Sequence, residues 1–527
     1  MLAKFKKPYI FLVAIVLFDA YLRLWKSTHL FLWINDYDEG AYSMGGRFIS
    51  QGFMPYKDFT LVHPPFYDLV LASIYKVFGY NFFYGRYFSV LLSIACLILV
   101  YFIVKKFYSS TAGIIASLLF VVFPEFYSSW YRVVQEPLGI FLVLSGLYFA
   151  GNYILYKKNR GHLLFSGLCL GLAVATKYTF IPAAAAFVTG IGVISTEWNW
   201  RNIRSYYTGL LKREFWILVG GIIASFSLVT GYFIVKFPRE FFAQTLFSQL
   251  GYRVGNSVET INHKLARLPS GIRQMLVFSR GTFAETISTL FVAGCIILLI
   301  VLLFKKNRAK PDVFFLTATV VSLLLCSFFN PFGETRYFVS FYLFILLAIV
   351  TFIPALKINQ MKEQFNIHSL FMNIGAIGFS LLLIICLAGT IVLRMDYNFL
   401  NSTNLTYEEQ SYKETIAYLE NVKAKKIYVI DPIIPALSPN LKSVLEFDTF
   451  GKIITMNGSP DIYYQAILNE GVDYVVIDPF CLLSINYSGQ HIRELIDDIQ
   501  KNGVLVKRIV PNDVAILGTQ IYEVTHR

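Results

Sequence analysis

Long apolar runs with almost no charge recur along this chain of 527 residues, and they constrain its fold more than any other feature. Several approach the roughly 20 residues that an α-helix needs to cross a bilayer. Hydrophobic residues make up 56% of the sequence and charged residues only 15%, whereas a soluble domain carries about 25% charged residues. The sequence therefore predicts a polytopic α-helical membrane protein.

We expect about eleven transmembrane helices within residues 1–393. Their predicted limits are 8–25, 82–104, 110–123, 137–156, 161–176, 179–195, 215–235, 285–304, 313–329, 337–354 and 370–393. The segment 64–78 is also apolar but contains Asp68 and Lys76. It is consistent with a helix lying along the membrane surface or with a further span, and the sequence leaves both open.

The net charge of +13 comes mainly from lysines and arginines beside the apolar runs. With eleven spans, the pairs Lys105-Lys106, Lys157-Lys158 and Lys305-Lys306 fall on the same side as the N-terminus. Positive loops mark the cytoplasmic side, so we expect a multi-pass membrane protein with a cytoplasmic N-terminus. The loop 26–81 and the C-terminal region then lie outside the cytoplasm. This topology accounts for the positive charge, and no nucleic acid partner is expected.

After Leu393 the composition is no longer membrane-like, and residues 394–527 are predicted to form an extracytoplasmic α/β domain. Predicted helices alternate with predicted strands in the order Tyr407–Val422, Lys426–Ile430, Pro460–Gly471, Val472–Ile477, His491–Lys501, Val504–Val510 and Thr519–Val524. This alternation favours a mainly parallel sheet. The domain contains no Gly-rich phosphate loop, so we interpret it as accessory, with a part in positioning an acceptor.

Three carboxylates, Asp36, Asp38 and Glu39, stand in the loop 26–81 just before a predicted helix, Gly40–Gln51. One interpretation is structural, because acidic residues at a helix start cap it and complement its dipole. The other is chemical. Adjacent residues on a helix point in different directions, so Asp38 and Glu39 should not share one task. One would act on a substrate while the other holds a neighbour in place.

The motifs that follow make the pattern familiar. They are Asp38-Glu39-x-x-Tyr42, Gly52-x-x-Pro55-Tyr56, His63-Pro64-Pro65, Arg132 to Pro137, Ala175 to Tyr178 and Glu334 to Tyr337. In this order, and all on the predicted external side, they resemble the GT-C superfamily of polytopic glycosyltransferases. The resemblance covers roughly residues 8–393 and is to the branch of protein O-mannosyltransferases and lipid A aminoarabinose transferases.

The resemblance implies a sugar donor carried on polyprenyl or dolichyl phosphate and a reaction at the outer face of the membrane. It also implies an acidic residue of the first loop beside the attacking group. That role falls on Asp38, with Glu39 or Asp36 in reserve. Basic residues near the membrane face would hold the leaving phosphate, and members of this branch often carry a lysine near the position of His63.

The same chemistry follows from the reaction itself. An acceptor hydroxyl or amine that attacks an anomeric carbon needs a base, and fixed cations stabilise the departing phosphate. The candidate cations, all at predicted external ends of spans, are Lys177, Arg336, Arg132 and His63. The alternative for Lys177 and Arg336 is snorkelling at the interface. Glu136 is expected to orient Arg132 or to line the acceptor groove, and Tyr42 to support the acceptor or the local structure.

The sequence thus predicts an inverting glycosyltransferase, transferring a hexosyl or pentosyl group to a protein, lipid or glycan. Carboxylates with His63 can bind a divalent ion, and oligosaccharyltransferase relatives use one. The branch resembled here generally does not, so we expect no obligatory metal and no other cofactor. The alternative function is a transporter or flippase of a lipid-linked sugar. That class favours internal repeats and charges near mid-membrane, and neither pattern is visible in the sequence.

Overall fold

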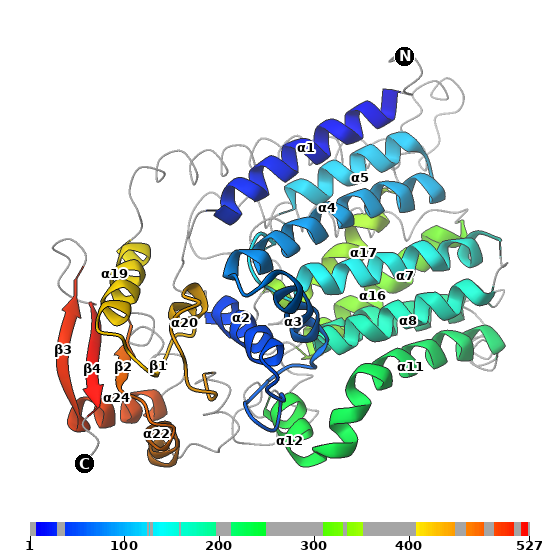
Figure 1. Ribbon diagram of the computed structural model, residues 1–527. Helices are drawn as coiled ribbons and strands as arrows, with labels where there is room; N and C mark the ends of the chain where they lie inside the picture. Colours follow the sequence, from blue (N-terminus) through cyan, green and yellow to red (C-terminus); the bar gives the residue numbers. More distant parts are fainter. Residues whose placement is uncertain are drawn as a thin grey trace.

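The computed structural model describes residues 7–28, 37–123, 126, 130–156, 160–195, 212–248, 309–329, 335–350, 407–447, 460–478, 490–510 and 518–524. A bundle of helices forms one part of the molecule, and a small sheet with its own helices forms the other (Figure 1). Two short helices, α2 (Tyr37–Ser50) and α3 (Phe66–Phe78), lie between them (Figure 1).

The described part of the bundle contains nine apolar helices, namely α1 (Lys7–Thr28), α4 (Phe82–Phe107), α5 (Ser110–Val122), α7 (Glu136–Tyr156), α8 (Arg160–Thr176), α9 (Ile181–Ser195), α11 (Arg213–Lys236), α16 (Lys310–Phe329) and α17 (Val339–Ile349). Six of these segments are long and apolar enough to cross a membrane, and α5, α8 and α17 are shorter. Nine of the predicted spans coincide with these helices. The predicted spans 285–304 and 370–393 lie outside the described residues.

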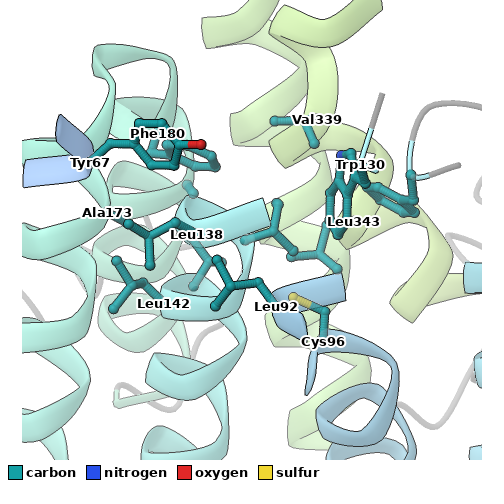
Figure 2. Packing of buried hydrophobic residues seen from close by; sticks show 14 of the residues in the cluster. Tyr67, Leu92, Cys96, Trp130, Leu138, Leu142, Ala173, Phe180, Val339 and Leu343 are labelled. Atoms are coloured by element: carbon teal, nitrogen blue, oxygen red, sulfur yellow. The ribbon is translucent and has the colours of Figure 1, made fainter. Parts of the chain in front are cut away.

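Glycine and apolar contacts hold the bundle together. A methyl group on Gly221 of α11 would lie 2.7 Å from the carbonyl oxygen of Leu164 in α8, so the two helices approach as only small residues allow. Figure 2 shows part of the buried core, with Leu138 and Leu142 of α7 beside Ala173 of α8. The bundle thereby offers a rigid base for the segments that connect its helices.

Within the segment 64–78, residues Phe66–Phe78 form α3, which has 13 residues and packs against α2. A helix of that length is roughly 20 Å long, whereas a bilayer core is about 30 Å thick. This length favours the surface interpretation over a further span. The predicted helix at Gly40 is confirmed, but it begins at Tyr37, so Asp38 and Glu39 both lie in its first turn.

The C-terminal region consists of α19 (Tyr407–Asn421), β1 (Ile427–Val429), α20 (Ile433–Leu437), α22 (Pro460–Asn469), β2 (Tyr474–Ile477), α24 (Gln490–Asn502), β3 (Gly503–Ile509) and β4 (Thr519–Val524). The strand order is β1-β2-β4-β3. The β1–β2 pair is parallel, but β2–β4 and β3–β4 are antiparallel.

The prediction of a mainly parallel sheet is therefore wrong. Only residues 510–518 join β3 to β4. A parallel pair needs a crossover connection of about a dozen residues or more, usually through a helix. With a shorter connection the chain reverses direction, and β4 enters between β2 and β3 antiparallel to both.

Alternate residues of the strands face two different layers, as the two-residue period of a strand requires. Tyr428 and Ile477 face α22 and α24 in a separate small core. Val429 and Val476 face α19 and α20, and this side is continuous with the core of the bundle. The C-terminal region thus packs onto the rest of the molecule through α20, which lies beside α2 (Figure 1).

Candidate active site

Glu39 is buried in an ion pair. Its carboxylate accepts two hydrogen bonds from Arg86 of α4, at 2.6 Å from Nε and 2.9 Å from Nη2. The backbone N–H of Val133 donates a third, at 3.0 Å. Glu39 is 1% exposed and Arg86 is fully buried. Both carboxylate oxygens are engaged, so Glu39 ties α2 to α4 and to the segment that carries Arg132.

Asp38, the neighbour of Glu39, has a different environment because it is only half-buried. It shares one face of α2 with Tyr42, four residues further on. The Tyr42 ring lies 5.9 Å from the imidazole of His63 and 5.7 Å from the ring of Tyr67, between centroids. The structure therefore places His63 against Tyr42, on the face of α2 that also carries Asp38. Asp36 lies outside the described residues.

The turn before His63 is held in an uncommon backbone conformation. Tyr56 has φ of 69°, a region that a bulky residue rarely occupies and that is found at functional sites. Burial, with a further contribution from Asp68, raises the pKa of the Tyr56 phenol well above its usual value. The phenol stays protonated and donates to the carbonyl oxygen of His63 at 2.7 Å.

Gln244 fixes the same turn from the other side. It lies in η3 (Ala243–Phe247), a turn of π-helix that follows α12 (Pro238–Phe242). Its amide donates to the carbonyl of Tyr56 at 3.1 Å and accepts from the N–H of Leu61 at 3.0 Å. The residues that follow, 249–308, are outside the described part of the structure.

Lys177 and Glu136 form a second buried ion pair. Glu136 opens α7, and Lys177 lies between α8 and a short 3-10 helix, η2 (Tyr178–Phe180). Their Nζ and Oε1 atoms are 2.7 Å apart, and the two residues are 2% and 4% exposed. The ammonium is also 5.7 Å from the centre of the Tyr337 ring. Glu136 was expected to orient Arg132 or to line the acceptor groove, and its pairing with Lys177 was not predicted.

Two further predicted cations are placed only in part. The guanidinium carbon of Arg132 lies 5.5 Å from the centre of the Tyr131 ring, and Nη2 is 3.4 Å from the Tyr131 hydroxyl. Because Glu39 binds the next residue along the chain, the position of Arg132 depends on α2. Arg336 belongs to η4 (Thr335–Phe338), but its side chain is outside the described part of the structure.

Tyr67 of α3 lies between α2 and the Lys177–Glu136 ion pair in its interactions. Its ring packs against that of Tyr42 in α2. Burial raises the pKa of its phenol well above the usual value, and the nearby carboxylates of Asp68 and Glu136 contribute to the rise. Tyr67 thus packs against Tyr42 of α2 and also senses the charge of Glu136, the partner of Lys177.

Sequence reasoning missed Tyr67 and Arg86. Arg86 had a signal, because an arginine inside an apolar run is costly unless a partner neutralises it. No group of three or more potential metal-ligating side chains is found among the residues that the structure describes.

Comparison with known proteins shows which fold this chain shares. Residues 62–236 match the family model described as dolichyl-phosphate-mannose-protein mannosyltransferase. The crystal structure of ArnT from Cupriavidus metallidurans in the apo state is similar over 98% of this chain and 97% of that one, with a TM-score of 0.57 and 13% identity. The chain has the fold of the GT-C glycosyltransferases. The resemblance predicted from the motifs is therefore confirmed.

Two further structures share this GT-C fold. ArnT bound to undecaprenyl phosphate matches over the same shares of the two chains, with a TM-score of 0.55 and 14% identity. The Archaeoglobus fulgidus oligosaccharyltransferase tethered with an acceptor peptide matches over 99% of this chain and 75% of that one, with a TM-score of 0.51 and 13% identity. No curated protein sequence matches the chain. With this fold, and with six described helices long and apolar enough to cross a bilayer, the chain is a membrane protein.

Proposed function

We propose that this protein is an inverting glycosyltransferase that moves one sugar from a polyprenyl- or dolichyl-phosphate carrier to a protein, lipid or glycan. The observation that carries the proposal is the position of Asp38, which is half-buried on the same face of α2 as Tyr42, whose ring lies 5.9 Å from the imidazole of His63. The neighbouring Glu39 has both oxygens bound to Arg86. The similarity to ArnT bound to undecaprenyl phosphate supports a lipid-linked donor.

Asp38 is the proposed general base. It accepts the proton of the acceptor hydroxyl or amine as this group attacks the anomeric carbon opposite the phosphate, and the configuration inverts. Glu39 is less suited to this step, because protonation would break its pairing with Arg86. Its proposed role is to hold α2 and the Arg132 segment in place. Asp36 stays a reserve candidate.

Lys177, Arg336, Arg132 and His63 are the proposed partners of the leaving phosphate, whose negative charge grows as the glycosidic bond breaks. Lys177 is well suited to this task. An ammonium has three N–H donors, and Glu136 accepts one of them at 2.7 Å. The pair fixes the cation in a buried position while leaving donor capacity for a phosphate oxygen.

The proposed orientation places the N-terminus in the cytoplasm and the first loop and residues 394–527 outside. The acceptor would then approach from the extracytoplasmic side. The partners are the lipid-linked donor, the acceptor and membrane lipids.

The test is donor turnover by purified protein in lipid, supplied with a panel of radiolabelled polyprenyl-phosphate sugars and with host membranes as acceptor. We expect transfer with wild type and a loss of about 100-fold or more with Asp38→Asn, the size of a general base contribution. The matched control is Asp497→Asn, an exposed aspartate of α24 that should retain full transfer. Labelled lipid that crosses the bilayer without any transfer would support the flippase alternative instead.

A further inference from the structure

One arginine of α2 makes four hydrogen bonds to the C-terminal region. Arg47 lies in the last turn of α2 and is 6% exposed. Its guanidinium donates to four backbone carbonyl oxygens in α20 and the segment that follows it, at 2.9–3.2 Å, those of Pro435, Ser438, Pro439 and Leu441. A guanidinium carries five N–H donors in a fixed planar fork. It can therefore hold a curved piece of backbone in one shape.

Tyr80 completes this contact. Its ring lies 4.6 Å from the guanidinium carbon of Arg47, and its hydroxyl donates to the carbonyl oxygen of Ala436 at 2.6 Å. Tyr80 stands in the link between α3 and α4. Segment 435–441 is thus held from two separate parts of the N-terminal region at once.

Gly40 marks the other end of the same contact. A methyl group there would lie 2.7 Å from the carbonyl carbon of Pro432 and 2.8 Å from Cα of Ile433, so only glycine allows this approach. Gly40 and Arg47 are seven residues apart and share one face of α2. Asp38 lies about 200° around the helix axis from Gly40. Contact at both ends of the helix therefore sets the direction in which Asp38 points.

The start of α20 is itself tied to the sheet. Asp431, just after β1, accepts from the N–H of Ile433 at 3.0 Å and from the Tyr412 hydroxyl of α19 at 3.2 Å. Asp478, just after β2, accepts from the N–H of Asp431 at 3.1 Å. Both aspartates are buried. A continuous set of hydrogen bonds thus runs from the ends of two strands to the face of α2.

We propose that Arg47 is a positioning residue for glycosyl transfer, which locks α2 onto the C-terminal domain and so fixes the orientation of Asp38. The C-terminal domain is then a part of the catalytic apparatus rather than an accessory. This inference rests on the proposed function for its catalytic meaning, while the lock itself can be measured without activity.

The kinetic test compares Arg47→Ala with wild type in lipid. We expect kcat to fall by about 10- to 100-fold, because a small misplacement of a reacting group has an effect of that order. The donor KM should stay within about twofold, since the Lys177–Glu136 pair is held by α7 and α8. Millimolar guanidinium ion should restore part of kcat by entering the vacated carbonyl site, and it should restore none in Asp38→Asn. Arg160→Ala is the control, because that arginine is 58% exposed and pairs with Glu214.

The second test measures amide hydrogen exchange in the same variants. We expect the amides of α2 and α20 to exchange faster in Arg47→Ala, while those of α8 and α11 keep their wild-type rates. Arg47→Lys, which retains the charge but has fewer donors, should give an intermediate result and serves if the alanine variant does not fold.

Unchanged kcat in Arg47→Ala, or a raised donor KM with unchanged kcat, would overturn the positioning role. Unchanged exchange in α2 would overturn the lock. Absence of transfer by wild type would contradict the proposed function instead, and the exchange experiment would still decide whether the lock exists.

Discussion

Helix α2 packs through two faces that use similar residues but have different roles. One face, here called the bundle face, packs against α3 and α4: Glu39 pairs with Arg86, and a methyl group on Gly46 would lie 2.8 Å from Cβ of Leu71 in α3. The other, here called the domain face, packs against the C-terminal domain: Gly40 allows the close approach and Arg47 is the buried charge. Each face thus combines one glycine with one charged side chain seven residues away.

The difference lies in what neutralises the charge. The bundle face sets a carboxylate against a guanidinium, whereas the domain face sets a guanidinium against carbonyl dipoles. Removing one member of a buried ion pair leaves an unpaired charge, which is more costly than leaving uncharged carbonyl groups without their donor. The bundle face should therefore govern the stability of the fold, and the domain face should govern the orientation of α2.

The largest effect is expected at Glu39. Glu39→Ala leaves Arg86 charged in a fully buried place, and we expect the free energy of unfolding to fall by about 3–5 kcal/mol. Denaturant unfolding in detergent measures it. The double variant Glu39→Leu with Arg86→Met removes both charges and should recover most of the loss. A double variant no more stable than Glu39→Ala would show that the charge pair is not the cause.

A smaller effect should arise at Gly40. Gly40→Ala forces a methyl group against the backbone of Ile433, and overpacking of this kind costs about 1–3 kcal/mol. Gly231→Ala in α11 is the matched control, because no atom lies within 4 Å of the added methyl group there. Thermal unfolding should separate the two variants. Equal melting temperatures would mean that the backbone around Ile433 moves to accommodate the methyl group at no cost in stability.

Lys177 extends the comparison to a buried ion pair, because one of its members is also proposed to bind the donor phosphate. Lys177→Met should weaken binding of a polyprenyl-phosphate sugar by about tenfold, equivalent to roughly 1.4 kcal/mol. Binding can be measured by quenching of intrinsic fluorescence. Lys105→Met, which removes a lysine hydrogen-bonded to Tyr9 near the predicted cytoplasmic side, should bind the donor normally. Equal affinity in both variants would remove Lys177 from the phosphate site.

The smallest effect belongs to an exposed pair. Arg160→Ala breaks the contact with Glu214 at 2.9 Å, but the arginine is 58% exposed, so we expect a loss of less than about 1 kcal/mol. Chemical denaturation at low and high salt checks it, since screening should shrink even this difference. A loss as large as that of Glu39→Ala would contradict the role assigned to burial.

Local features of the fold were readable in the sequence. Helix α4 was predicted because its apolar run has the length and composition of a span, and α2 because acidic residues precede a helical pattern. The sheet was predicted wrongly, because the prediction followed the general alternation of helices and strands and overlooked the short link between its last two strands, which leaves no room for a crossover.

Long-range pairings could not be read in the same way. Arg47 meets carbonyls almost 400 positions further along the chain, and no local pattern signals a backbone acceptor. The Lys177–Glu136 pair joins the two ends of a helical hairpin, so its residues were predicted as functional but not as partners.

The most direct test of the division between Asp38 and Glu39 is single-turnover transfer in lipid, measured beside unfolding free energy for Asp38→Asn and Glu39→Gln. We predict that Asp38→Asn loses about 100-fold or more in transfer rate while keeping wild-type stability. For Glu39→Gln the main effect should be a lower free energy of unfolding, because its pairing with buried Arg86 weakens. An Asp38→Asn protein that transfers sugar at the wild-type rate would contradict the assignment of Asp38 as the base.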